Sequence, residues 1–176
     1  MKWIFFSYSL PAEPSKTRVH VWRQLRKLGA VSYQSIWAVP HAKDRIEVLK
    51  RLTEDVENWH GKALLIAGVV LVKSQEEDLK AAFMESRNEE YREVIGKCED
   101  YLKEIELEIG RQNFIFAEVE ENEVELEKLK QWLKKVQKRD LIKPPLRKVA
   151  LEKIRHCEKS FDDFARRVYD AQNSKE

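Results

Sequence analysis

The sequence predicts an α+β protein in two parts, with alternating strands and helices in residues 1–73 and helices alone in residues 74–176. The front part contains short aromatic or apolar segments separated by amphipathic ones, whereas the back part contains long apolar stripes at helical spacing. The charge also changes sign between the parts. Residues 1–73 carry 12 Lys and Arg against 6 Asp and Glu, and residues 74–176 carry 21 against 25.

The front part opens with an aromatic-rich segment, Lys2–Leu10, which ends at Pro11 and is typical of a buried strand. Ser15 is the expected N-terminal cap of a helix that runs to Leu28, because its side chain suits that position. Gly29 is a natural C-terminal stop for this helix. Its apolar face is expected to contain Val21, Leu25 and Leu28, with Trp22 alongside.

The remaining front segments complete the order β-α-β-β-α-β. Residues 30–34 and 36–40 are two short strand candidates, although 30–40 can also be read as one long strand. A second amphipathic helix fits 42–59 and stops at Gly61, and the strongly apolar segment 62–72 follows as a strand. This order predicts a ferredoxin-like domain over residues 1–73.

Three helices are expected in the back part, as a bundle or coiled-coil-like region over residues 74–176. Ser74 and Glu77 form a potential capping box for a helix that runs to about Glu108. Heptad spacing then predicts a second helix, whose apolar positions are Val119, Leu126, Leu129, Leu133 and Val136, with Asn122 as a polar exception. A third stripe contains Ala150, Ile154, Cys157, Phe161, Phe164, Val168 and Ala171.

Composition excludes several classes of protein. No apolar stretch is long enough to span a membrane, and the N-terminal residues lack the pattern of a secretory signal. Two cysteines, Cys98 and Cys157, make neither a disulfide framework nor a zinc site, so a protein of the reducing cytoplasm is expected. Both lie on apolar stripes, which predicts core thiols, and they become a potential redox pair if their helices pack together. The four histidines show no metal-ligand spacing, so we expect neither a metal nor a cofactor.

The start of the first predicted helix is a potential oxyanion-binding site made by Ser15, Lys16 and Arg18. Free N–H groups at a helix start attract anions, and the two cationic side chains would add full charges. The alternative is an ordinary capped helix with solvated basic residues.

The same helix carries a basic stripe. Lys16, His20, Arg23 and Lys27 share one helix face, Arg26 lies close by, and Arg18 precedes them at the helix start. Such a stripe can follow a phosphate backbone, so these residues are the predicted nucleic-acid-binding residues. An ordinary solvated helix face has the same appearance and remains an alternative.

Acidic residues cluster at Glu118, Glu120, Glu121, Glu123 and Glu125. Carboxylates can bind hard metal ions, but negative charge at a helix start also stabilises the helix, and we favour this structural role. No phosphate-binding loop, dinucleotide fingerprint or nucleophile elbow is present. The sequence therefore predicts a protein that is not an enzyme.

Three stretches resemble the N-terminal region of ChrB, the chromate-resistance regulatory protein family. They are FSYSLPAEPSKTRVHVWRQLRKLGAVSYQSIWAVP at 6–40, FAEVEENEVELEKLKQWLKKVQKRD at 116–140 and CEKSFDDFARRVYDA at 157–171. The resemblance implies a role in chromate resistance as a chromate-responsive transcriptional regulator, with DNA and chromate as partners. Two alternatives are an oxyanion-binding sensor and a non-enzymatic dimeric interaction module that lacks DNA binding.

The front part is also similar to the C-terminal, ferredoxin-like part of the PaaX regulators, in which a related helix follows a strand. It resembles, in addition, the small CRISPR adaptation nuclease-like proteins, whose proposed metal-binding Asp lies at the end of the first strand. Residues 7–10 read Ser-Tyr-Ser-Leu and contain no acid, so metal-dependent cleavage is not expected.

An apolar sheet with an open edge predicts a homodimer.

Overall fold

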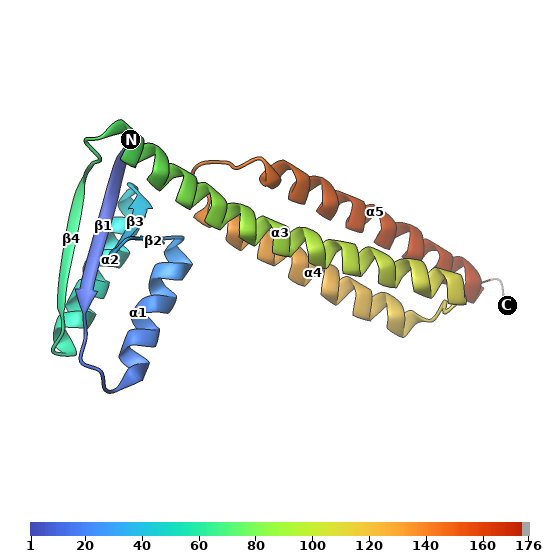
Figure 1. Ribbon diagram of the computed structural model, residues 1–176. Helices are drawn as coiled ribbons and strands as arrows, with labels where there is room; N and C mark the ends of the chain where they lie inside the picture. The colour runs from blue at the N-terminus through green and yellow to red at the C-terminus, as the bar shows by residue number, and fades with distance from the viewer. Residues whose placement is uncertain (174–176) are drawn as a thin grey trace. The chain divides into compact units, whose positions relative to one another are not determined.

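The computed structural model describes residues 1–173, and it is an α+β structure with a four-stranded antiparallel sheet and five helices (Figure 1). The strands are β1 (Lys2–Ser9), β2 (Val31–Tyr33), β3 (Ile36–Pro40) and β4 (Lys62–Val69). The helices are α1 (Ser15–Leu28), α2 (Lys43–Asn58), α3 (Lys73–Arg111), α4 (Phe116–Arg139) and α5 (Leu146–Asn173). The α+β class predicted from the sequence is confirmed.

Contacts divide the chain into two compact units, Met1–Ser86 and Arg87–Glu176, and the division falls inside α3. The first turns of α3 belong to the first unit because Phe83 lies edge-on to Trp3, with ring centroids 6.2 Å apart. Both rings are buried. The boundary suggested by the sequence, between residues 73 and 74, is the point at which α3 begins.

The sheet of the first unit has the strand order β2-β3-β1-β4, with every neighbouring pair antiparallel. The central strand β1 pairs through Ile4 with Val39 of β3 and with Ala67 of β4. Its aromatic and β-branched residues have high strand propensity and suit a strand that is paired along both edges. A hairpin, rather than one long strand, joins β2 to β3. The last strand, β4, ends at Val69, whereas the sequence predicted a strand that extends to residue 72. β4 lies at one edge of the sheet.

Helix α1 begins differently from the expectation. Pro14, and not Ser15, occupies the N-cap position, and no side chain caps the helix there. Ser15 is already the first helical residue, while the backbone N–H and the hydroxyl of Thr17 both donate to the Pro14 carbonyl. The helix ends as predicted, because Gly29 adopts a left-handed conformation with φ 75° that is favourable for glycine.

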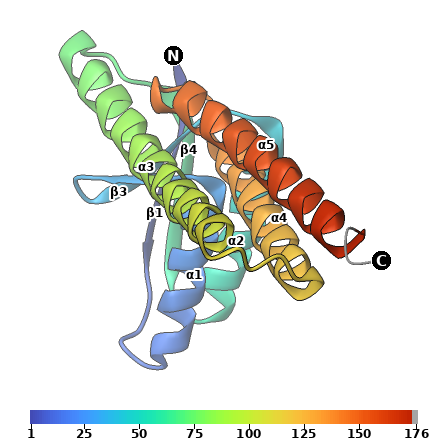
Figure 2. The same ribbon diagram turned by 90° about the vertical axis from the view of Figure 1, so that its right-hand side faces the viewer.

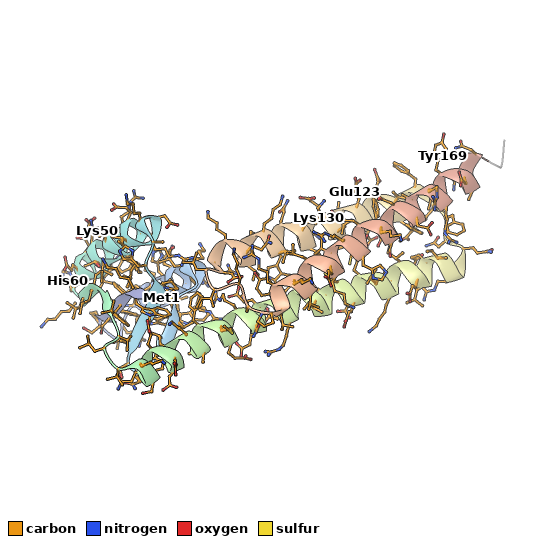
Figure 3. All side chains as sticks on the ribbon, turned by 90° about the horizontal axis from the view of Figure 1, so that it is seen from above. Met1, Lys50, His60, Glu123, Lys130 and Tyr169 are labelled. Atoms are coloured by element: carbon orange, nitrogen blue, oxygen red, sulfur yellow. The ribbon has the colours of Figure 1, made fainter. Side chains whose placement is uncertain are left out.

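The start of α3 also corrects the sequence analysis. The helix begins at Lys73, so Ser74 lies within its first turn and does not act as the cap of a capping box with Glu77. The adjacent Glu76 accepts a hydrogen bond from the N-terminal ammonium group of Met1, which Figure 3 labels. This hydrogen bond lowers the pKa of the Glu76 carboxyl.

The second unit has one apolar core between segments of α3, α4 and α5, which run side by side in Figures 1 and 2. The buried residues are Tyr91, Val94, Cys98, Tyr101 and Ile105 of α3, Leu126, Leu129, Leu133 and Val136 of α4, and Ala150, Ile154, Cys157, Phe164 and Val168 of α5. Asn122 is buried among them, and its amide donates to the Glu118 carbonyl at 2.8 Å. The buried amide of Asn122, the polar exception in the heptad pattern, therefore has a hydrogen-bond partner.

Asp140 organises the connection between α4 and α5. Its fully buried carboxylate accepts a hydrogen bond from the Tyr91 hydroxyl at 2.9 Å, and bonds from the backbone N–H groups of Ile142 and Lys143 at 3.0 and 2.7 Å. A guanidinium N–H of Arg147 donates to the same carboxylate at 3.3 Å. One side chain thus links α3, the connection and the start of α5.

Candidate functional site

Helix α1 presents all six predicted nucleic-acid-binding residues to solvent: Lys16, Arg18, His20, Arg23, Arg26 and Lys27. Five of them are Lys or Arg, and the helix contains no Asp or Glu. Each residue advances about 100° around an α-helix, so this set is divided between two sides of the exposed surface. Sequence spacing had predicted the first side. The second side contains Trp22, which the sequence analysis placed alongside the apolar face of the helix.

The first side, the basic stripe, consists of Lys16, His20, Arg23 and Lys27. Among residues 1–173, no acidic side chain pairs with Lys16, Arg23 or Lys27. His20 differs, because its Nε2 atom lies 3.9 Å from the Asp55 carboxylate of α2. These three unpaired cations are therefore the ones best placed to bind an external anion.

His20 also packs against α2 through its ring. The imidazole lies edge-on to the Trp59 indole, with ring centroids 5.3 Å apart. Together with the Asp55 contact, this arrangement holds one edge of the basic stripe against α2. His20 consequently has an intramolecular role that its position in the stripe did not predict.

The second side of α1 borders a shallow depression of about 310 Å³, which we call the aromatic hollow. It is lined by Ser15, Arg18, Val19 and Trp22 of α1 and by Tyr8 of β1. The guanidinium of Arg26 lies 5.7 Å from the centroid of the Trp22 ring, within cation–π range. About half of the surface of Trp22 is open to solvent. The sequence signal for this surface is Arg18-Trp22-Arg26, with a cation one turn before and one turn after the indole.

The predicted oxyanion site is only partly assembled. Ser15 and Arg18 both line the aromatic hollow, whereas Lys16 is not among its lining residues and belongs to the basic stripe. Tyr8 adds a hydroxyl that the sequence analysis had not included. Partial burial raises the pKa of Tyr8, and the positive charge of Arg18 opposes this rise. The hydroxyl therefore remains a neutral hydrogen-bond donor at physiological pH.

The acidic cluster at the start of α4 faces a groove of about 320 Å³ between α3 and α4. The carboxylates that line it are Asp100 and Glu104 of α3 and Glu118, Glu121 and Glu125 of α4. Glu123 lies on a different side, along α4 from Lys130, as Figure 3 shows. Within the described residues, no group of three His, Cys, Asp or Glu side chains could hold a metal ion. The groove also contains Lys97, which offsets part of its negative charge.

The two cysteines meet in the core of the second unit. Cys98 of α3 and Cys157 of α5 are fully buried, and the Cys157 thiol donates to the Cys98 carbonyl at 3.6 Å. The neighbouring Cys98 thiol and burial together raise the pKa of Cys157. Both residues are therefore core thiols in this structure, and they lie close together.

The helices between residues 1 and 173 include none with the length and apolar character needed to cross a membrane.

The chain was compared with models of known protein families. The model of the family described as "Protein ChrB, N-terminal" matches residues 18–175, from the first turn of α1 to beyond α5. A comparison with curated protein sequences finds no match.

Proposed function

Because this chain belongs to the ChrB N-terminal family of chromate-resistance regulatory proteins, we propose that it is a chromate-responsive transcriptional regulator that contacts DNA through α1. The family match extends over parts of both structural units, from residue 18 to residue 175, and agrees with the resemblance found in three stretches of the sequence. The transcriptional role and the DNA contact go beyond the family match. They depend on the chemistry of α1.

The observation that carries the DNA contact is the unopposed positive charge of α1. The helix has five Lys and Arg side chains and no acidic residue, and Lys16, Arg23 and Lys27 have no ion-pair partner among the described residues. Cations that are free in the unbound protein can neutralise phosphates without first breaking an internal pair. Each phosphate contact then releases counterions, which makes binding favourable at low salt.

We interpret the first unit as ferredoxin-like, because its elements follow the order β-α-β-β-α-β and its strands the order β2-β3-β1-β4. The three helices of the second unit, with their shared core, are interpreted as a bundle. The similarity of the first unit to the C-terminal part of PaaX regulators remains a prediction from the sequence.

The edge strand β4 supports a homodimeric assembly. Leu64 and Ile66 are about half exposed on one face of this strand, and Val69 is exposed at its end. An open, apolar edge strand can pair with the same strand of a second copy across a two-fold axis.

We also propose that the protein has no catalytic activity of its own and acts in the cytoplasm. The end of β1 has no carboxylate, since residues 7–10 are Ser-Tyr-Ser-Leu, and two-metal phosphodiester cleavage requires clustered carboxylates. Incubation of the purified protein with DNA and Mg²⁺ or Mn²⁺ tests this. Metal-dependent cleavage that disappears when an acidic residue is substituted would contradict the proposal.

A second candidate function is an oxyanion sensor, favoured by the Ser15 and Arg18 side chains in the aromatic hollow. Chromate would then bind directly to this chain and stabilise it. The measurement is thermal unfolding with chromate or with sulfate, which has similar shape and charge. Stabilisation by chromate alone supports the sensor, and equal effects of the two anions contradict it.

The DNA-binding function is tested by fluorescence anisotropy with a labelled duplex from upstream of the protein's own gene. We expect saturable binding that weakens as salt rises, and a change of affinity when chromate, but not sulfate, is added. An unrelated duplex of equal length serves as the control. Absence of binding to both duplexes at low salt would contradict the DNA contact and leave the sensor and the dimeric interaction module as alternatives.

A further inference from the structure

The aromatic hollow combines an exposed indole with two cations. Trp22 is 49 % exposed and Val19 beside it is 40 % exposed, whereas Val21 and Leu25 of the same helix are fully buried. Arg26 lies over the Trp22 ring at 5.7 Å, and Arg18 lines the same depression one helical turn before it. About half of the Trp22 surface is therefore not used by the protein's own core. It remains available to an external partner.

The charge of the surroundings selects the partner. Because α1 has no acidic residue and contributes Arg18 and Arg26 to either side of Trp22, a cationic or purely apolar partner would meet uncompensated positive charge. An anionic partner with a flat aromatic group satisfies both the cations and the indole. Nucleic acid strands carry a phosphate and a base in every nucleotide, and proteins bind them with this combination of aromatic and cationic side chains.

The base must be unpaired to use this surface. In a duplex the faces of the bases are covered by their neighbours in the stack, so an indole on the outside reaches phosphates and groove edges only. Stacking on Trp22 becomes possible in a single strand, at a strand end, or where a duplex is locally opened. The hydroxyls of Tyr8 and Ser15, which line the hollow, can donate hydrogen bonds to the phosphate or the base edge.

We propose that Trp22, flanked by Arg18 and Arg26, is a stacking platform for an unpaired base of a nucleic acid strand. This inference rests on the proposed function and deepens it by adding a second contact surface on α1. The basic stripe binds phosphates without regard to base pairing, and the aromatic hollow distinguishes unpaired from paired nucleotides. The two surfaces lie on adjacent sides of one helix, so a single strand or a partly opened duplex can contact both.

The experiment compares a labelled oligothymidine strand with a duplex of the same length in fluorescence anisotropy. We expect Trp22→Ala to weaken binding of the single strand by about fivefold or more, because stacking contributes at this level for each base. Its dependence on salt should not change, because no cation is lost. Trp22→Phe should retain most of the affinity, and duplex binding should be unaffected by either substitution.

Tyr169→Ala is the matched control, because Tyr169 is an even more exposed aromatic residue on α5, labelled in Figure 3. Arg18→Ala should in contrast reduce the salt dependence of single-strand binding by about 0.7 in the log–log slope, if one phosphate contact is lost. Thermal unfolding of each variant checks the fold, and no change is expected for side chains this exposed.

The outcomes separate this inference from the proposed function. Equal single-strand affinities of Trp22→Ala, Tyr169→Ala and the unmodified protein would overturn the stacking platform. If the unmodified protein still binds the duplex in that case, the proposed DNA contact stands. Absence of binding to both strand and duplex would overturn both. Trp22-dependent binding to vesicles that contain anionic lipids, with none to the strand, would assign the hollow to a membrane surface and overturn the inference.

Discussion

Asp140 is the side chain whose loss should most destabilise the second unit. Its carboxylate is fully buried and accepts hydrogen bonds from Tyr91, from two backbone N–H groups and from Arg147. Asp140→Ala leaves the buried Tyr91 hydroxyl without an acceptor, which costs about 1–3 kcal/mol. Loss of the charged partner of Arg147 and of the turn's amide acceptors adds to this cost, so we expect a total of about 3 kcal/mol or more.

Urea unfolding monitored by circular dichroism measures this cost. Tyr91→Phe should cost less, about 1 kcal/mol, because it removes one hydrogen bond and leaves the Asp140 carboxylate with its other donors. Asp100→Ala is the matched control, since this carboxylate is 65 % exposed and makes one surface ion pair with Lys97. If Asp140→Ala and Asp100→Ala unfold at the same urea concentration, the reasoning about the buried carboxylate is refuted.

Other predictions concern assembly, the thiols and acid stability. Light scattering at tens of micromolar should show that the unmodified protein is a dimer, and Ile66→Lys should convert this dimer to a monomer. Ile115→Lys, which changes a similarly exposed isoleucine outside β4, should leave the dimer intact. A monomeric unmodified protein would contradict the predicted dimer. Cys98 and Cys157 should react with an aromatic disulfide reagent only as the protein unfolds, because both are fully buried, and rapid reaction in the native state would disprove this. The lowered pKa of Glu76 means that its contribution to stability is present above the ordinary carboxyl value near 4.5 and is lost as the pH falls below it. Glu76→Gln should therefore reduce the loss of stability between about pH 6 and pH 3, and a pH profile equal to that of the unmodified protein would be the contrary result.

Local sequence patterns were sufficient to predict most of the elements. The aromatic segment that became β1, the left-handed stop at Gly29 and the heptad positions of α4 each depend on a few neighbouring residues. The two cap assignments failed because a cap depends on where the helix actually begins. Ser15 and Ser74 are favourable cap residues, but α1 and α3 begin before either could serve.

The division of the chain inside α3 depends on contacts distant in sequence. Phe83 continues a helical pattern and gives no local indication that it covers Trp3 of β1. In the same way, the sequence placed Cys98 and Cys157 on separate apolar stripes, and only the packing of α3 against α5 shows that the thiols meet. Such pairings depend on which helix faces are opposite each other, which periodicity alone does not determine.

Of the two surfaces of α1, the sequence predicted the basic stripe and missed the aromatic hollow. The spacing of Lys16, Arg23 and Lys27 identified the basic stripe, since residues on one helix face are fixed by the helical repeat. Trp22 was placed alongside the apolar face of Val21, Leu25 and Leu28, and its spacing gave no indication of how exposed it is. Its exposure, and the Tyr8 side chain from β1 that lines the hollow with it, depend on how α1 lies on the sheet.

The salt dependence of duplex binding by two double variants tests the central claim, that α1 is the DNA contact. Arg23→Ala with Lys27→Ala removes two cations from the basic stripe, and Lys134→Ala with Lys135→Ala removes two exposed cations from α4. The first variant should bind more weakly, with a log–log salt slope about 1.8 less negative than that of the unmodified protein, because each phosphate contact contributes about 0.9. The second variant should retain both affinity and slope. Equal slopes for the two variants and the unmodified protein would contradict the account.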